Sequence, residues 1–143
     1  MSNNFRRYGM LAKVMDIRTI DTLGSGSLSF FEAPGDLPFD IKRVYYTYGV
    51  PAGTRRGKHA HRALRQMLIC PYGEIEVLLD DGRRKEIVPL NNPSQGLIVE
   101  PFVWHEMVWS RDESVLMVVA SMPYEESDYI RDYDAFLRAV NAD

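Results

Sequence analysis

The sequence predicts an all-β fold, a barrel or sandwich of short strands followed by one α-helix. Short apolar segments recur at roughly 8–12-residue spacing with turn-forming residues between them, which is typical of a β-sandwich or barrel. Only the C-terminal end changes to a helical spacing of apolar residues. At 143 residues the chain has the size of one domain. We expect that domain at residues 13–143, preceded by a polar arm at residues 1–12.

The expected strands are short segments with turn-forming residues on both sides. The segment 41–48 is rich in β-branched and aromatic side chains, which favours a strand. Around Asp81-Gly82, a favoured tight-turn pair, two segments give the best hairpin signal, and a further turn is expected at residues 24–27. In chain order, we expect strands at residues 13–17, 28–32, 41–48, 75–79, 84–90, 97–100, 105–109 and 115–121.

The last segment has the pattern of an amphipathic helix. Ser127 is its expected N-cap, and Asp128 is well placed against the helix dipole. We expect this helix to pack on the outside of the sheet and to have no part in the chemistry. Its apolar side chains follow helical spacing and would form one stripe: Tyr129, Ile130, Tyr133, Phe136, Leu137 and Val140.

Composition and charge exclude several classes of partner. The net charge is −3, from 17 basic and 20 acidic residues, so no basic surface is available to hold nucleic acid. No stretch approaches the ~18 apolar residues of a membrane span. The single cysteine, Cys70, lies in an apolar run, which indicates a buried thiol. We therefore expect a cytoplasmic protein without nucleic-acid or membrane partners.

A histidine pair lies inside a glycine-bounded segment, which contains in order Gly53, His59, His61, Gln66 and Gly73. Because side chains alternate along a strand, both imidazoles face the same side, which in a barrel can be the interior. The segment resembles the first sequence motif of the cupin superfamily, and Pro101 with His105 resembles the second. This resemblance implies a cupin-type β-barrel, or jelly roll, with a C-terminal α-helix.

The same motif leads to an expectation about metal ions. In metal-binding cupins a glutamate stands where this chain has Gln66, and a neutral amide oxygen is a weaker ligand than a carboxylate. Three histidines, His59, His61 and His105, could still hold zinc or iron. Alternatively, they simply hydrogen-bond within a polar barrel interior. We expect no metal and no other cofactor.

Four blocks of the sequence resemble, in order, the nucleotide-sugar 3,4-ketoisomerases; they are residues 41–46, 56–61, 103–107 and 127–133. Enzymes of that family act on dTDP-4-keto-6-deoxyglucose in a cupin barrel, usually as dimers and without a required metal. The resemblance implies a dTDP-linked keto-deoxysugar substrate, a homodimer and an active site at the histidine pair. Ser25 is one departure, since relatives often carry an arginine before Gly26-Ser27-Leu28.

The implied reaction moves a ketone from carbon 4 to carbon 3 of the sugar through an enediolate. Histidine suits this chemistry because its pKa lies near working pH. We expect His61 to be the carbon base and His59 to shuttle the oxygen-bound proton, and the two roles could be exchanged. Tyr46, the third expected catalytic residue, would donate to the developing charge. It could equally be a half-buried barrel aromatic.

The expected substrate-binding residues lie around this pair in the sequence. Arg56 and Lys58 would hold the pyrophosphate, or they are ordinary surface charges. Trp104 would stack on thymine or pack in the core. Tyr48 shares one face of its strand with Tyr46. The remaining expected substrate-binding residues are Gln66 and His105.

Three other functions share parts of this pattern. A nucleotide-sugar 3,5-epimerase has the same barrel and substrate class, but it uses a histidine assisted by an aspartate, plus a tyrosine acid. The histidine pair of this sequence has no obvious aspartate partner. A non-catalytic sugar-binding cupin would bind ligand without turnover. A metal-dependent dioxygenase would need stoichiometric iron.

Overall fold

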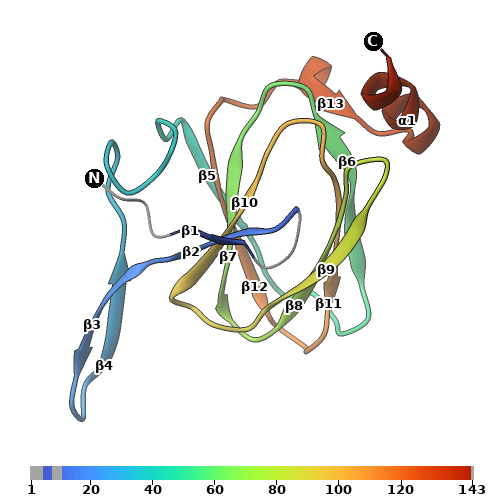
Figure 1. Cartoon of the computed structure of the whole chain (residues 1–143). Helices are drawn as coiled ribbons and strands as arrows, with labels where there is room; N and C mark the ends of the chain where they lie inside the picture. The colour runs from blue at the N-terminus through green and yellow to red at the C-terminus, as the bar shows by residue number, and fades with distance from the viewer. Residues whose placement is uncertain (1–4, 8–10, 143) are drawn as a thin grey trace.

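Two antiparallel sheets face each other across one core and form a jelly-roll barrel (Figure 1). The computed structural model describes residues 5–7 and 11–142. The larger sheet has the order β1-β2-β10-β7-β12-β5, which are Phe5–Arg7, Lys13–Asp16, Gln95–Val99, Gln66–Tyr72, Val115–Ala120 and Arg43–Thr47. The smaller has the order β13-β6-β11-β8-β9, which are Tyr129–Ile130, Arg55–His61, Trp104–Trp109, Ile75–Asp80 and Lys85–Leu90. The predicted all-β barrel is confirmed.

The core lies between the sheets because each strand turns every second side chain inward. In β8, Ile75, Val77 and Leu79 face the core while Glu76 is exposed. The predicted hairpin around Asp81-Gly82 is also confirmed, since β8 pairs with β9 in antiparallel register. Cys70 is 1% exposed, as predicted, and burial raises the pKa of its thiol to about 11.

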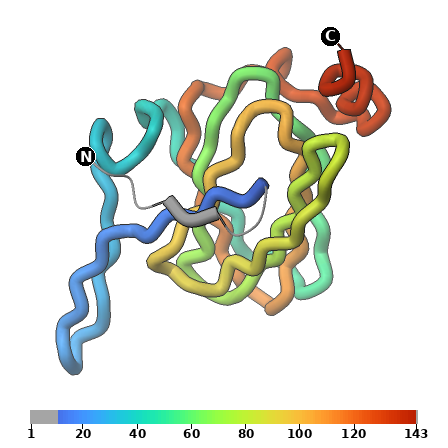
Figure 2. The backbone as a smooth tube through the Cα atoms, viewed as in Figure 1, coloured from blue at the N-terminus to red at the C-terminus, as the bar shows by residue number. Residues whose placement is uncertain are grey.

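A second hairpin extends away from the barrel (Figures 1 and 2). It consists of β3 (Arg18–Thr22) and β4 (Gly26–Phe30), which pair in antiparallel register. The sequence pattern does not predict β3, because all five of its residues are exposed and no apolar alternation marks it. β4 begins inside the predicted turn, two residues before the predicted strand.

The predicted N-terminal arm, residues 1–12, lies largely outside the described residues. Of its residues, Phe5–Arg7 pair as β1 with β2. A domain boundary at residue 13 therefore stays a prediction. Within residues 5–7 and 11–142, no helix is both long and apolar enough to span a membrane.

The C-terminal helix is shorter than the apolar pattern indicates. α1 spans Tyr133–Asn141, and the side chain of Asp132 caps it by accepting a hydrogen bond from the backbone N–H of Ala135. The predicted N-cap is wrong, because Ser127 and Asp128 lie in a 3-10 turn, η1 (Glu126–Asp128). The next two residues form β13 against β6. The packing of α1 on the outer face of the smaller sheet is confirmed by a cluster that contains Phe136, Ala60 and Trp104. Figure 2 shows the helix outside the barrel.

Candidate active site

The only three histidines of the chain meet on the inner face of the smaller sheet. His59 and His61 come from β6, and His105 lies directly opposite His59 on β11. The ring centroids are 4.5 Å apart for His59 and His105, 4.9 Å for the β6 pair and 5.8 Å for His61 and His105. These three residues are called the histidine cluster below. The prediction that both imidazoles of the pair face the interior is confirmed.

In His61 and His105, a hydrogen bond at Nδ1 determines the tautomer of the imidazole. His61 Nδ1 lies 3.1 Å from a carboxylate oxygen of Asp128, and His105 Nδ1 lies 3.0 Å from the carbonyl oxygen of Val103. Both partners can only accept, so both Nδ1 atoms carry the proton. The Nε2 atom of His105 accepts a hydrogen bond from the amide of Gln66 at 3.1 Å. His59 Nδ1 is buried and has no hydrogen-bond partner among the described residues.

Burial keeps the histidine cluster neutral. Loss of surrounding water, and then repulsion from His59, lower the pKa of His61 to about 4 and that of His105 to about 3. Burial is also the main cause that holds the pKa of His59 below its ordinary value. Neutral imidazoles carry a free lone pair at pH 7, so they can accept a proton from a substrate.

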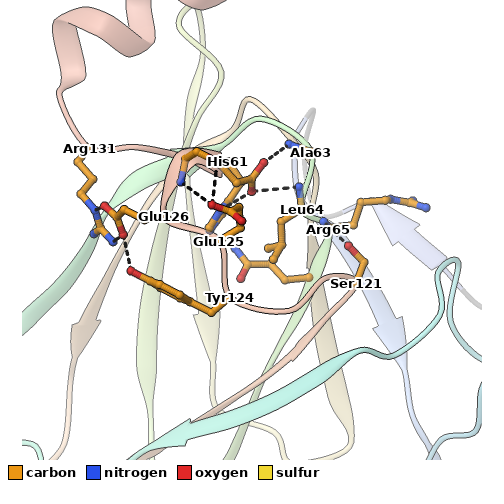
Figure 3. A network of polar contacts seen from close by, with 12 residues as sticks. His61, Ala63, Leu64, Arg65, Ser121, Tyr124, Glu125, Glu126 and Arg131 are labelled. Carbon is orange, nitrogen blue, oxygen red and sulfur yellow. Dashed lines mark hydrogen bonds and ion pairs between the residues drawn. The ribbon is translucent and has the colours of Figure 1, made fainter.

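The segment that follows β12 lies against the histidine cluster, although the sequence pattern predicts only a structural role for it. Tyr129 lies opposite His61 in the β13–β6 pairing, and its ring centroid is 4.4 Å from that of His61 and 4.9 Å from that of His59. The guanidinium of Arg131 lies 4.1 Å from the Tyr129 ring and pairs with Glu126 (Figure 3). Tyr129 is thus a site residue that the sequence reasoning misses.

Asp128 is a second residue that the sequence reasoning misses. It is 7% exposed, and its carboxylate lies behind His61 rather than at a helix dipole. The block at residues 127–133 carries a family resemblance, which is a signal that could have found it. The helical spacing of the apolar side chains concealed this signal.

The tyrosine that faces the site is Tyr45, and Tyr46 faces away from it. Tyr45 pairs with Val118, which belongs to the inner core, whereas Tyr46 pairs with Met117, which packs on the outer face of the sheet. Tyr46 is 62% exposed and stands beside Tyr48, which is 71% exposed. In this chain, strand alternation therefore separates both predicted tyrosines from the histidine cluster.

Arg43 accompanies Tyr45 on the inner face. Its guanidinium carbon lies 5.1 Å from the Tyr45 ring, and its Nε is buried without a hydrogen-bond partner among the described residues. Its charge also helps to lower the pKa of His61. Burial, and then the neighbouring Tyr129, raise the pKa of Tyr45 to about 12, so this hydroxyl stays protonated and can donate.

The other predicted binding residues lie in different places. Gln66 is buried beside His105, as described above. Arg56 is exposed and pairs with Met107 of the inner core, so it projects from the inner face at the sheet margin. Lys58 is exposed, with a φ of 61° next to a β-bulge.

Trp104 lies on the opposite side of the smaller sheet from the histidine cluster. Its ring centroid is 5.2 Å from that of Tyr133 and 5.7 Å from that of Phe136, and its Nε1 donates to Glu106 at 2.9 Å. It is 5% exposed, which agrees with packing, the second of the two expected roles, rather than with stacking on thymine.

The histidine cluster was also compared with what a metal ion requires. One nitrogen from each histidine lies within 4.8 Å of the others, and imidazole is a suitable ligand for zinc or iron. However, this group contains no carboxylate among the described residues, and Gln66 already occupies the Nε2 atom of His105. The cluster could hold a divalent ion only after Gln66 moves, and the absence of a required metal stays a prediction.

A jelly-roll barrel with a cluster of imidazoles on its inner face defines a cupin-type protein. The chain belongs to the family described as FdtA: WxcM-like, C-terminal, whose model matches residues 10–141. Over 115 residues it is 45% identical to the TDP-4-oxo-6-deoxy-alpha-D-glucose-3,4-oxoisomerase of Aneurinibacillus thermoaerophilus. These residues are 80% of this chain and 83% of that protein. The predicted family is thereby confirmed.

Solved structures agree with this family. A 3,4-ketoisomerase from Helicobacter canadensis is 41% identical, with a TM-score of 0.88, over 93% of this chain and 99% of that one. QdtA, a sugar 3,4-ketoisomerase from Thermoanaerobacterium thermosaccharolyticum in complex with TDP, is 40% identical, with a TM-score of 0.87, over 90% and 93%. NovW, a 4-keto-6-deoxy sugar epimerase from Streptomyces spheroides, is 16% identical with a TM-score of 0.74, over 90% and 73%, which shows a shared fold alone.

Proposed function

We propose that this protein is a 3,4-ketoisomerase that converts a TDP-linked 4-keto-6-deoxyhexose to its 3-keto isomer. The observation that carries the proposal is the neutral histidine cluster on the inner face of the barrel, in a chain whose similar relatives are 3,4-ketoisomerases. A relative bound to TDP supports the same nucleotide for this chain.

The reaction requires three proton transfers and no oxidant. A base removes the proton from carbon 3, and the electron pair moves toward the ketone at carbon 4 to give an enediolate. The proton on the oxygen of carbon 3 then passes to the oxygen of carbon 4, and a proton is added at carbon 4. Carbon 3 is oxidised and carbon 4 is reduced by the same amount.

His59 and His61 supply these transfers in our proposal, because they are neutral neighbours with ring centroids 4.9 Å apart. One imidazole is the carbon base, and the other carries the proton between the two oxygens. Tyr45 and Arg43 replace the expected Tyr46 as the groups that stabilise the enediolate from β5, because they lie on the inner face. Such donors act on charge that develops in the transition state.

The test is a proton NMR time course with TDP-4-keto-6-deoxyglucose in deuterated buffer. A 3-keto sugar with solvent deuterium at carbon 4 is the expected product. Deuterium at carbons 3 and 5, with the ketone still at carbon 4, would identify an epimerase instead. Unchanged substrate would contradict both reactions.

A homodimer is also part of the proposal. β5 is an edge strand of the larger sheet, and its outer face exposes Val44 and Tyr46 by 52% and 62%. The projecting hairpin exposes Ile20 and Leu28 by 57% and 59%. Exposed apolar groups on an unpaired edge favour an interface. Light scattering during gel filtration should give twice the mass of one chain, and the mass of a single chain would contradict the dimer.

A further inference from the structure

The carboxylate of Asp128 contacts two backbone N–H groups and the imidazole of His61. One oxygen accepts a hydrogen bond from the backbone N–H of Ala63 at 2.7 Å, and the other lies 3.3 Å from the N–H of Leu64 and 3.1 Å from His61 Nδ1. Figure 3 labels these three partners. The two segments are also joined by a hydrogen bond from the N–H of Arg62 to the carbonyl oxygen of Asp128, at 2.9 Å. The carboxylate is therefore fixed before any substrate binds.

The hydrogen bond from His61 Nδ1 to Asp128 determines which nitrogen of His61 carries the proton. An ionised carboxylate only accepts hydrogen bonds, so it requires the proton of a neutral His61 to be on Nδ1. The lone pair is then on Nε2, at the opposite end of the ring. Without this partner, a neutral imidazole in a buried site could adopt either tautomer, and only one leaves Nε2 free to accept a proton.

We propose that Asp128 is a positioning residue of the reaction, which fixes the orientation and the Nδ1–H tautomer of His61 so that Nε2 is available for proton transfer. The proposal rests on the function proposed above and adds to it a residue of the segment that follows β12. It holds whether His61 acts as the carbon base or as the carrier between oxygens.

The matched variants are Asp128→Asn and Asp132→Asn. In the first, one amide oxygen replaces two carboxylate oxygens. If it keeps the 2.7 Å bond to Ala63, the amide nitrogen faces both the N–H of Leu64 and His61; it can only donate, which demands the wrong tautomer of His61. The second makes the same chemical change four residues later, at the exposed N-cap of α1, where asparagine caps equally well. Both variants should therefore fold, and only the first should affect His61.

The kinetic test separates positioning from a structural role. For Asp128→Asn we expect kcat to fall about 100-fold or more, while KM and the Kd for TDP stay within about threefold. Asp132→Asn should retain the kcat of the parent. The inference is overturned if Asp128→Asn keeps its kcat, or if it loses TDP affinity and thermal stability to the same degree as activity.

A spectroscopic test needs neither turnover nor a variant. Two-bond proton–nitrogen correlation spectra of the imidazole rings report which nitrogen carries the proton, and the chain has only three histidines to assign. For the parent at pH 7.5 we expect a protonated Nδ1 and a bare Nε2 on His61. The opposite tautomer would overturn the inference. If the expected tautomer is found but the keto sugar is not isomerised, the proposed function fails while the role of Asp128 in orienting His61 stands.

Discussion

The histidine cluster should make the folded state sensitive to mild acid. An unfolded chain binds protons at its histidines with a pKa near 6.5, whereas burial in the folded state lowers the pKa of His61 to about 4 and of His105 to about 3. The unfolded state therefore binds more protons between these values. Stability contributed by the neutral rings is present in full above about pH 6.5 and is lost as pH falls toward the folded-state values.

The size of the effect follows from these pKa values. Between pH 7.5 and 5.5, each of the two rings loses about 1.3 kcal/mol of unfolding free energy, so the pair loses about 3 kcal/mol. This is a large share of the roughly 5–15 kcal/mol that stabilises a typical domain. Carboxyl groups contribute little over this range, because most of them titrate below pH 5.5.

The measurement is urea unfolding at both pH values for the parent and for His105→Gln. Because every histidine of the chain belongs to the cluster, no other imidazole can contribute to the difference. The parent should lose at least about 3 kcal/mol, because the pKa of His59 is lowered as well, and the variant should lose about 1.3 kcal/mol less than the parent, whatever its own stability at pH 7.5. Equal losses in the two proteins, or no loss in the parent, would refute the conclusion that burial keeps these rings neutral.

Three further predictions concern the residues around the histidine cluster. Tyr45→Phe should lower kcat about 100-fold, whereas Tyr46→Phe should leave it nearly unchanged; the reverse order in a steady-state assay would contradict the assignment of the inner face. Added Zn²⁺ should inhibit in competition with substrate, because it would bind the three imidazoles, while EDTA should leave the activity intact; loss of activity with EDTA would indicate a required metal. Trp104→Phe should lower the unfolding free energy by about 1–2 kcal/mol without changing the Kd for TDP, as calorimetry can check, and weaker TDP binding would restore the stacking interpretation.

The sequence predicts most of the strands because their alternation is tied to burial. β8 and its hairpin with β9 follow directly from apolar residues at every second position. β3 could not be predicted in this way, because a projecting hairpin has no buried face. The pattern that predicts strands is a pattern of burial, so it does not mark strands that stand away from the core.

The site was predictable where strand alternation alone decides it. Alternation brings His59 and His61 to one face, and the second motif adds His105. Tyr46 shows the limit, because the two faces of β5 are both partly exposed and the sequence does not indicate which is inner. Only the pairing of β5 with β12 shows that Tyr45 faces the interior.

The predicted structure of the C-terminal segment is wrong for a different reason, because the same apolar residues fit both one long helix and a strand followed by a shorter helix. Ile130 and Leu137 are seven residues apart, which fits one helix stripe, yet both pack in the same cluster although Ile130 belongs to a strand. β13 buries Ile130 on the outer face and thereby turns Tyr129 toward His61. A long-range pairing that no local pattern shows thus adds both Tyr129 and Asp128 to the site.

The discovery of Asp128 removes one argument against an epimerase, since a histidine with an aspartate behind it is now present. Both reactions begin in the same way, because the protons on carbons 3 and 5 are both acidified by the ketone at carbon 4. The two reactions differ in what happens at the oxygens. Isomerisation must move a proton from the oxygen of carbon 3 to the oxygen of carbon 4, whereas epimerisation leaves the ketone at carbon 4. In the proposed mechanism, the second neutral imidazole carries this proton between the oxygens. The feature that favours an isomerase is therefore the neighbouring pair His59 and His61, 4.9 Å apart, rather than the absence of an aspartate.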